Sequence, residues 1–259
     1  CVDPAPSNDR CSGATELSLA APQVIFSAIL VGANRDLTAP CGSSGADVFY
    51  RFTVPAGSRQ LVYADTFGAA FDTVLYFASG CTSVLSGSTT AGDATCNDDS
   101  CGPLQSQVAA LLNPGTYYLV VAGYGGSTGT TPVRFQHMPV GNGPLALLNQ
   151  GSTTVSGSTS GTGQVVGCTG SGPENTYWWR TCNTGGAGTL TATTCSRAGW
   201  DTVLYFSNGD GGGGACNDDA CGLQSQISGA VTAGPGLHTL TIDGWGGNSG
   251  SYSIAVTRP

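Results

Sequence analysis

One seven-residue stretch decides the fold because it occurs twice. Phe71-Asp72-Thr73-Val74-Leu75-Tyr76-Phe77 recurs as Trp200-Asp201-Thr202-Val203-Leu204-Tyr205-Phe206. Three more motifs recur in the same order, so that residues 96–102, 104–108 and 123–126 match residues 216–222, 223–227 and 244–247. The two copies are offset by about 120 residues, which is the length of one domain. The sequence therefore predicts a duplicated module.

Within each copy, short apolar runs alternate with polar residues. Val48, Tyr50, Phe52 and Val54 show the two-residue period of a strand with one buried face. The strands expected on this basis span residues 24–31, 47–54, 59–66, 73–77, 105–112, 116–122, 131–136, 176–182, 188–194, 202–206, 224–230, 237–243 and 251–256. We expect an all-β chain of two tandem antiparallel β-sandwich domains, jelly-roll-like and disulfide-stapled. Residues 1–138 form the first domain, residues 139–146 a linker and residues 147–259 the second domain.

Composition excludes several classes of function. The formal net charge is −8, and all eight basic residues are Arg. Without a basic surface, neither nucleic-acid binding nor attachment to an anionic membrane surface is expected. The sequence has no apolar run long enough for a transmembrane helix. Eleven Cys and no initiator Met lead us to expect a processed, secreted or cell-surface bacterial protein, in which Cys1 is either a disulfide partner or a lipidated residue.

The repeated motifs resemble the pre-peptidase C-terminal (PPC-like) modules of secreted bacterial proteins, in their Cys-containing, myxobacterial form. The matching residues are 47–52, 71–76, 96–99 and 112–124 in the first copy, and 200–205, 216–219 and 237–245 in the second. The resemblance implies a non-catalytic, jelly-roll-like sandwich that accompanies exported hydrolases or binds extracellular polymers or calcium. The second copy departs from the pattern near residues 175–181, where Trp178-Trp179 are taken to replace Phe49-Tyr50.

The repeated Cys-Asn-Asp-Asp loops carry the most specific chemistry. Each loop offers an amide oxygen and two adjacent carboxylates, and Ca²⁺ prefers such oxygen ligands. An Asp at a strand start adds a further carboxylate if it faces the loop. The candidate calcium ligands are Asp72, Asn97, Asp98, Asp99, Asp201, Asn217, Asp218 and Asp219. The alternative is an Asx-type turn in which these side chains bond their own backbone.

The cysteines allow several pairings. Cys96–Cys101 and Cys216–Cys221 would clasp the Asn-Asp-Asp loops, and Cys81–Cys96 is a rival pair. Cys182–Cys195 and Cys11–Cys41 complete the simplest scheme, which leaves Cys1, Cys81 and Cys168. Because the count is odd, at least one Cys lacks an intrachain partner, either as a free thiol or in an intermolecular bond.

Enzyme activity is not expected. His137 lies at the domain join and His238 on a strand, so neither accompanies a nucleophile motif. We expect a self-assembling structural subunit of a surface fibre or coat. The alternative is a secreted module that binds a glycan or an extracellular protein and is stabilised by calcium. Tyr124 and Trp245, in glycine-rich loops, are the candidate binding aromatics, although such rings can also cap a core.

Overall fold

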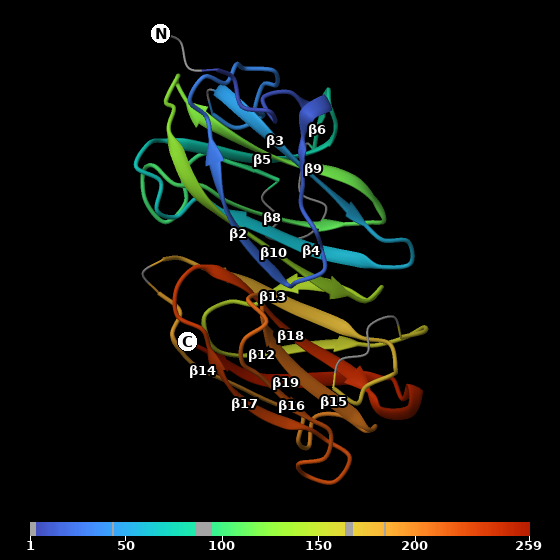
Figure 1. Ribbon diagram of the computed structural model, residues 1–259. Coiled ribbons are helices and arrows are strands. Elements are labelled where there is room, and N and C mark those ends of the chain that lie inside the picture. Colours follow the sequence, from blue (N-terminus) through green and yellow to red (C-terminus); the bar gives the residue numbers. More distant parts are fainter. Residues whose placement is uncertain (1–3, 43, 86–94, 164–167, 184) are drawn as a thin grey trace. The chain divides into compact units, whose positions relative to one another are not determined.

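The computed structural model describes residues 4–42, 44–85, 95–163, 168–183 and 185–259. The chain divides into two compact units, Cys1–Met138 and Pro139–Pro259, called the first and second modules below (Figure 1). The described residues contain no α-helix, only the 3-10 turns η1 (Cys11–Gly13) and η2 (Trp245–Gly247). No helix among them is long and apolar enough to cross a membrane. Strands enter the predicted linker from both sides, leaving residues 141–144 between β10 and β11.

The first module contains two sheets. Six strands form the sheet β1-β3-β9-β5-β6 with β7 added on β5, and four form the sheet β2-β10-β4-β8. Their bounds are β1 Thr15–Glu16, β2 Gln23–Ile29, β3 Ser44–Val54, β4 Arg59–Asp65, β5 Thr73–Gly80, β6 Ser83–Val84, β7 Cys96–Asn97, β8 Gln107–Leu112, β9 Gly115–Tyr124 and β10 Thr130–Val140. β1 runs parallel to β3, whereas the pairs β2–β10, β3–β9, β4–β8, β5–β6, β5–β7 and β5–β9 are antiparallel.

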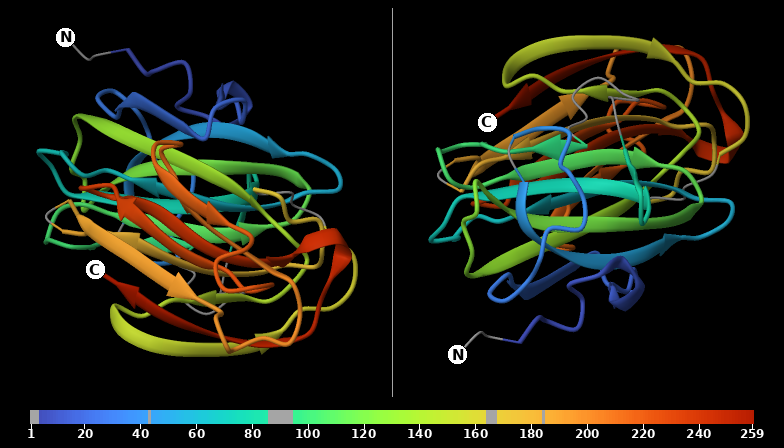
Figure 2. Two further views of the ribbon diagram at one scale, coloured as in Figure 1. Left: turned by 90° about the horizontal axis from the view of Figure 1, so that it is seen from below. Right: turned by 90° about the horizontal axis from the view of Figure 1, so that it is seen from above.

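The second module repeats this topology. Its sheets are β11-β13-β18-β15-β16 and β12-β19-β14-β17. The strands are β11 Leu145–Leu147, β12 Gly151–Ser158, β13 Asn175–Thr181, β14 Gly188–Thr193, β15 Thr202–Asn208, β16 Gly214–Asn217, β17 Gln226–Val231, β18 Gly236–Gly244 and β19 Ser251–Arg258. Each has a counterpart in the first module, including the parallel pair β11–β13, whereas β6 has no match among the described strands of the second module. Figure 2 shows β12 (yellow) and β19 (red) side by side, as their antiparallel register requires.

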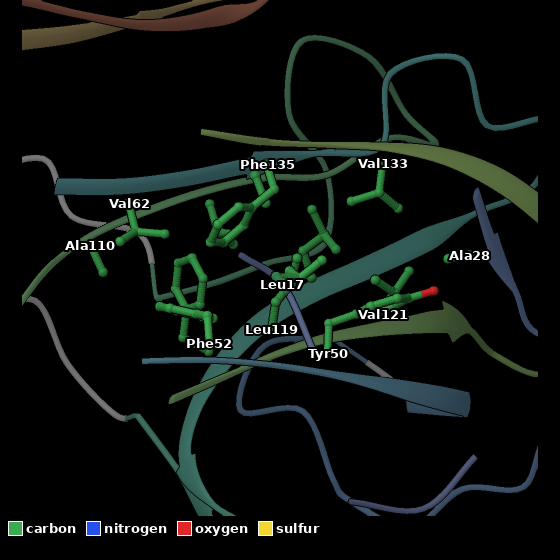
Figure 3. Close-up of a cluster of buried hydrophobic side chains, with 14 of the residues drawn as sticks. Leu17, Ala28, Tyr50, Phe52, Val62, Ala110, Leu119, Val121, Val133 and Phe135 are labelled. Atoms are coloured by element: carbon green, nitrogen blue, oxygen red, sulfur yellow. The ribbon is translucent and has the colours of Figure 1, made fainter. Parts of the chain in front are cut away.

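Each module encloses its own apolar core, because alternate residues of facing strands point inward. In the first module, Phe52 of β3 packs on Phe135 of β10 with ring centroids 5.0 Å apart (Figure 3). Val62, Leu119 and Val121 join the same cluster. In the second module, Trp179 of β13 stacks on Phe206 of β15 at 5.8 Å. The predicted all-β, sandwich-type fold is confirmed, and both cores follow the period-two pattern of the sequence.

Two details of the sequence interpretation are wrong. Short or weakly apolar strands were missed, most clearly β12, whose residues Gly151–Ser158 include a single large apolar side chain, Val155. The alignment of the two copies near β13 also shifts. Val48 lies opposite Val121 and Asn175 opposite Ile242 at matching positions of the paired strands. Consequently Tyr177 corresponds to Tyr50 and Trp179 to Phe52.

The disulfides differ from every predicted pair. The described pairs are Cys11–Cys81, Cys41–Cys96, Cys168–Cys216 and Cys195–Cys221, with Cα–Cα distances of 5.4, 5.8, 5.9 and 5.9 Å. Cys96–Cys101, Cys216–Cys221, Cys182–Cys195, Cys11–Cys41 and the rival Cys81–Cys96 are therefore wrong. Partners distant in sequence meet because strand pairing brings their loops together, which spacing along the chain cannot show.

The remaining cysteines complete this picture. Cys101 and Cys182 are also disulfide-bonded, whereas Cys1, one of the residues left over in the predicted scheme, lies outside the described residues. Cys81 and Cys168, the other two, each have a partner. Such dense cross-linking is typical of extracellular proteins.

Candidate metal centre

Three carboxylates meet in the first module. Asp72 immediately precedes β5, while Asp98 and Asp99 follow β7, which pairs with β5. One oxygen from each of the three side chains lies within 4.8 Å of the others. Oδ1 of Asp72 and Oδ1 of Asp98 are buried and have no hydrogen-bond donor in the described part of the chain. Unpartnered, crowded carboxylate oxygens favour a bound cation.

The second module repeats the arrangement with Asp201, Asp218 and Asp219. Their oxygens also lie within 4.8 Å of one another, and the pair of strands that positions them is β15–β16. Again Oδ1 of Asp201 and Oδ1 of Asp218 are buried without a donor among the described residues. In this module Thr169 Oγ1 also donates a hydrogen bond of 3.4 Å to Asp218 Oδ2. The six predicted aspartates are thus brought together in two trios.

The side-chain oxygens of the two predicted asparagines accept backbone hydrogen bonds that hold the loops. Asn97 Oδ1 accepts the backbone N–H of Gln107 at 2.9 Å, and Asn217 Oδ1 accepts that of Gln226 at 3.0 Å. Asn97 Nδ2 also donates to the Asp99 carbonyl at 3.1 Å. The accepted N–H groups belong to β8 and β17, nine or ten residues further along the chain, so these bonds tie the loop to a neighbouring strand and differ from the Asx-type turn that the sequence offered as the alternative to metal binding. In this structure the Asn residues shape the turn and the Asp residues form the cluster.

Buried serines, which the sequence analysis did not select, position both trios. Ser106 Oγ donates to the carbonyl of Asp98 or Thr73, each 2.5 Å away. Ser225 does the same in the second module, with the Asp218 carbonyl 2.7 Å away and the Thr202 carbonyl as its other partner. Both serines are fully buried. Their signal was present in the repeated Gln-Ser-Gln motif, where the polar residue is retained at a core position.

Buried threonines tie the same serines to the neighbouring strands. Thr66 Oγ1 lies 2.6 Å from Thr73 Oγ1, and Thr194 Oγ1 lies 2.7 Å from Thr202 Oγ1. Thr66 and Thr194 also accept the backbone N–H groups of the two serines, at 3.0 and 2.9 Å. Because every member of this network is bonded, the network fixes the backbone on which the aspartates stand.

The carboxylates repel one another. Partial burial, then Asp72 and Asp99, raise the pKa of Asp98, while partial burial and Asp99 raise the pKa of Asp72. In the second trio, partial burial and the two other carboxylates raise the pKa of Asp201. Partial burial and Asp219 raise the pKa of Asp218, and the bond from Thr169 opposes the shift. A divalent cation would remove this repulsion, since it favours the ionised form of every ligand.

One disulfide in each module reaches the trio. Cys41–Cys96 and Cys168–Cys216 occupy equivalent places, because Cys96 and Cys216 begin the two Asn-Asp-Asp motifs. They bring a second loop against the trio. Gly42 has a φ of +77° and packs so closely that an added Cβ would lie 2.5 Å from Asp98 Oδ2. In the second module, Thr169 takes this position and donates to Asp218.

The candidate aromatics adjoin the trios. The backbone N–H of Tyr124 donates to the Asp72 carbonyl at 3.0 Å, and that of Trp245 donates to the Asp201 carbonyl at 3.2 Å. Tyr124 and Trp245 are 39% and 46% exposed, and neither is among the residues that pack against the described core clusters. Each module thus presents an exposed aromatic residue next to an acidic cluster.

Comparisons with known proteins assign no family. No protein-family model and no curated protein matches the chain. Among solved structures, the CUB1-EGF-CUB2 domains of rat MASP-1 are 12% identical, with 93% of this chain and 99% of that chain covered and a TM-score of 0.25. The same domains of human MASP-1/3 are 11% identical, with 92% and 100% covered and a TM-score of 0.26. At these TM-scores the sandwich architecture rests on the strand pairing described above.

Proposed function

We propose that the chain is a non-catalytic, extracellular binding protein in which each module holds a calcium ion. The observation that carries this proposal is the duplicated aspartate trio, which has two unpartnered carboxylate oxygens in each copy. The set consists of carboxylates alone and lacks the nitrogen or sulfur ligands typical of zinc. The resemblance of the same motifs to PPC-like modules supports this proposal.

Calcium would act here as a structural clamp for a binding edge. It would join the start of β5 or β15 to the Asn-Asp-Asp loop, and the carbonyl of the same Asp72 or Asp201 accepts the N–H of the exposed aromatic residue. Tyr124 and Trp245 would thereby be held in place for a glycan or protein ligand. Exposed aromatic rings on rigid loops bind at little cost in conformational entropy.

The histidines support a role without catalysis. His137 Nδ1 lies 3.1 Å from Gln60 Oε1 and its Nε2 lies 2.9 Å from the Ala21 carbonyl. His238 Nδ1 lies 2.8 Å from Asn208 Oδ1 and its Nε2 lies 3.2 Å from Thr181 Oγ1. Both residues are buried, so all four ring nitrogens are used in the interior.

Isothermal titration of the EDTA-treated protein with CaCl₂ tests the proposal. We expect two sites in the parent chain, one in Asp98→Asn or Asp218→Asn, and none in the double variant. Asp36→Asn is the matched control, because Asp36 is exposed, lies outside both trios and removes the same charge. No calcium binding by the parent chain, or an equal loss in the control, would overturn the proposal.

A self-assembling structural subunit is the second candidate. It is favoured by β2, an edge strand of its sheet, whose exposed residues include Ile25 (59% exposed) and Ile29 (50%). An apolar edge strand is a site for strand addition between copies. Negative-stain microscopy and sedimentation of the parent chain and of Ile25→Lys test this candidate. Fibres that the substitution abolishes would support it, and a monomeric parent chain would contradict it.

A further inference from the structure

The second module has a cavity at the side of the sandwich where β11 and β12 are the edge strands of the two sheets. The cavity is half-enclosed and has a volume of about 230 Å³. Its walls are Pro144, Ala146, residues 156–158 of β12, Asn175, Tyr177 and Tyr252. No member of either aspartate trio lines it, so the cavity is separate from the candidate metal centres.

Two tyrosine hydroxyls meet at the wall of this cavity. Tyr177 of β13 and Tyr252 of β19 come from different sheets, and their hydroxyl oxygens are 2.9 Å apart. Asn175 Nδ2 donates to the Tyr252 hydroxyl at 2.8 Å and to the Ser158 carbonyl at 3.1 Å. Gly157 leaves room for the Tyr252 hydroxyl, since an added Cβ would lie 2.6 Å from its oxygen. Because Gly157 and Ser158 line the cavity, these polar groups lie at its wall.

One phenol hydrogen of this group has no acceptor. The two phenols carry two hydrogens, and the bond between the hydroxyls uses one of them. Asn175 Nδ2 is a donor, so it cannot accept the other. Neither tyrosine has a further hydrogen-bond partner in the described part of the chain, although Tyr177 is 7% and Tyr252 5% exposed. Whichever tyrosine donates to the other, a buried donor is left over at the cavity wall.

The spare hydrogen stays on its oxygen at neutral pH. Burial, then the bond with Tyr252, raise the pKa of Tyr177. Burial also raises the pKa of Tyr252, although the bonds from Tyr177 and Asn175 oppose the shift. The pair is therefore a hydrogen-bond donor, and a buried donor without an acceptor is unfavourable, so an acceptor supplied from outside would be bound.

We propose that this cavity, called the tyrosine cavity, binds a small uncharged molecule that has an apolar ring and a hydrogen-bond acceptor. The acceptor would take the spare phenol hydrogen. The ring would lie against Pro144, Ala146 and the two tyrosine rings, an apolar lining with few polar groups that is typical of small-molecule sites. The volume suits a single ring with a substituent, since a cavity of about 150 Å³ already admits benzene. An ionised ligand would be desolvated without a counter-charge, because the lining residues carry none.

The first module lacks the tyrosine pair. Gly129 and Gly250 are equivalent, because their carbonyls accept the N–H groups of the residues that follow β2 and β12. Two residues further on, Thr131 therefore stands where the second module has Tyr252. The second hydroxyl of the pair thus has no phenol counterpart in the first module.

Tyr50, the counterpart of Tyr177, has other partners. Its ring packs on Phe26 with centroids 4.4 Å apart, and its hydroxyl donates to the Ser27 carbonyl at 3.5 Å. The phenol hydrogen of Tyr50 thus has a backbone acceptor. The proposed site belongs to the second module, and matched positions of the first module provide controls.

Fluorine NMR titration with three matched probes tests the proposal. The probes are 4-fluoroacetophenone, whose carbonyl is an acceptor, its alkene isostere 4-fluoro-α-methylstyrene, and the anion 4-fluorobenzoate. We expect the parent chain to bind the ketone about fivefold more tightly than the alkene or the anion, which is the effect of one hydrogen bond. Ala146→Leu fills the cavity and should weaken ketone binding about tenfold. Thr15→Leu is the control, because Thr15 pairs with Tyr50 as Ala146 pairs with Tyr177.

Removing the polar hydrogens tests how the ligand is selected. The triple variant Asn175→Val, Tyr177→Phe and Tyr252→Phe replaces all partners by apolar groups of similar shape. It should bind ketone and alkene equally. Either single Tyr→Phe variant leaves one phenol hydrogen without an acceptor and should keep the preference for the ketone. Tyr50→Phe is the control in the first module, and thermal unfolding should show that every variant folds.

Each other outcome overturns the proposal. No binding of the ketone to the parent chain, or equal binding to Ala146→Leu, would show that the tyrosine cavity is not a ligand site. Equal affinities of the parent chain for ketone and alkene would show that the spare hydrogen is satisfied by water only. Calcium titration of the same samples keeps the two proposals apart, since all these variants should retain both calcium sites whatever the probe result.

Discussion

The two modules are most alike at their acidic clusters and most different on their four-stranded sheets. Both have an aspartate trio, a buried Ser that binds the trio's backbone, and a disulfide to the first Cys of the Asn-Asp-Asp motif. The outward sides of β4 and β14 differ, by contrast. β4 carries the buried residues Leu61, Tyr63 and Asp65 at the positions where β14 has exposed or half-buried threonines. The two copies thus retained the buried polar network of the site, which constrains the fold strongly, and diverged on the outward side of these strands.

A second contrast lies on the paired central strands. The register places Ala122 and Tyr117 of β9 where β18 has Asp243 and His238. Both residues of the second module are buried. The second module thus carries two buried ionisable groups in its central strand at positions where the first module has Ala122 and Tyr117, and each should add its own contribution to the pH dependence of that module's stability.

The largest effect is expected from the disulfide that the modules share. Replacing Cys41 and Cys96 by Ser should lower the free energy of unfolding by about 2–5 kcal/mol, because the unfolded chain gains entropy. It should also abolish the calcium site of the first module, because the Gly42 loop is no longer held against Asp98. Differential scanning calorimetry and calcium titration measure the two effects.

The bond between Cys11 and Cys81, which has no equivalent in the second module, provides the control. Its partners are 70 residues apart, compared with 55 for Cys41 and Cys96, so replacing both by Ser should cost a similar amount of stability. Both calcium sites should remain. Loss of a calcium site in this variant as well would break the link between the shared disulfide and the trio.

The buried serines should have equal effects in the two modules. Ser106→Ala and Ser225→Ala each leave carbonyl acceptors without a donor, which costs roughly 1–3 kcal/mol. Urea unfolding measures the loss. Ser228→Ala is the control, since Ser228 is exposed on β17 and its replacement should change stability by less than about 0.5 kcal/mol. An unchanged free energy of unfolding in Ser106→Ala would contradict the role of the network in holding the trio.

Asp243→Asn should stabilise the second module above neutral pH. Burial, then the nearby Glu174, raise the pKa of Asp243 to about 7, although the N–H groups of Gly244 and Gly172 oppose the shift. Because the folded pKa exceeds the usual 3.8, the folded state binds the proton more tightly, and stability falls as pH rises between these values. At pH 8 the substitution should gain roughly 1–2 kcal/mol, and the gain should vanish near pH 4.

Asp47→Asn in the first module should instead lower the stability of that module at pH 8. Burial raises the pKa of Asp47 to about 6, but its oxygens accept hydrogen bonds from the N–H groups of Asp36 and Leu37 and from the Tyr76 hydroxyl. An amide offers only one acceptor oxygen, so the variant should be less stable than the parent at pH 8. Thermal melts at pH 4 and pH 8 check both variants. Equal gains in the two would contradict the comparison.

His238→Gln should give the smallest change, about 1 kcal/mol at low pH. Burial lowers the pKa of His238 to about 4 from the usual 6.5, and the charge of Arg258 adds to this while Asp210 opposes it. The unfolded chain therefore binds more protons in this window, and stability falls as pH drops from about 6.5 to about 4. Chemical unfolding at several pH values should show a flatter profile for the variant. An unchanged slope would exclude His238 as the cause.

The sequence by itself determined the duplication, the all-β class with its strongly alternating strands, and the identity of the six aspartates. These features depend on local pattern: the alternation at Val48–Val54 specifies a buried face wherever the strand pairs, and each repeated motif carries its own chemistry. Pairing β5 with β7, and β15 with β16, then had to bring the aspartates together.

Only the tertiary structure decided the disulfides, the place of β12 in its sheet and the use of the asparagines. Cys41 meets Cys96 because loops from different strands converge, and no spacing rule contains that information. β12 lacks the apolar alternation of a strand, and it is held through its register with β19. Through this register Ser152 and Thr257, which are far apart in the sequence, become neighbours whose hydroxyl oxygens are 2.9 Å apart.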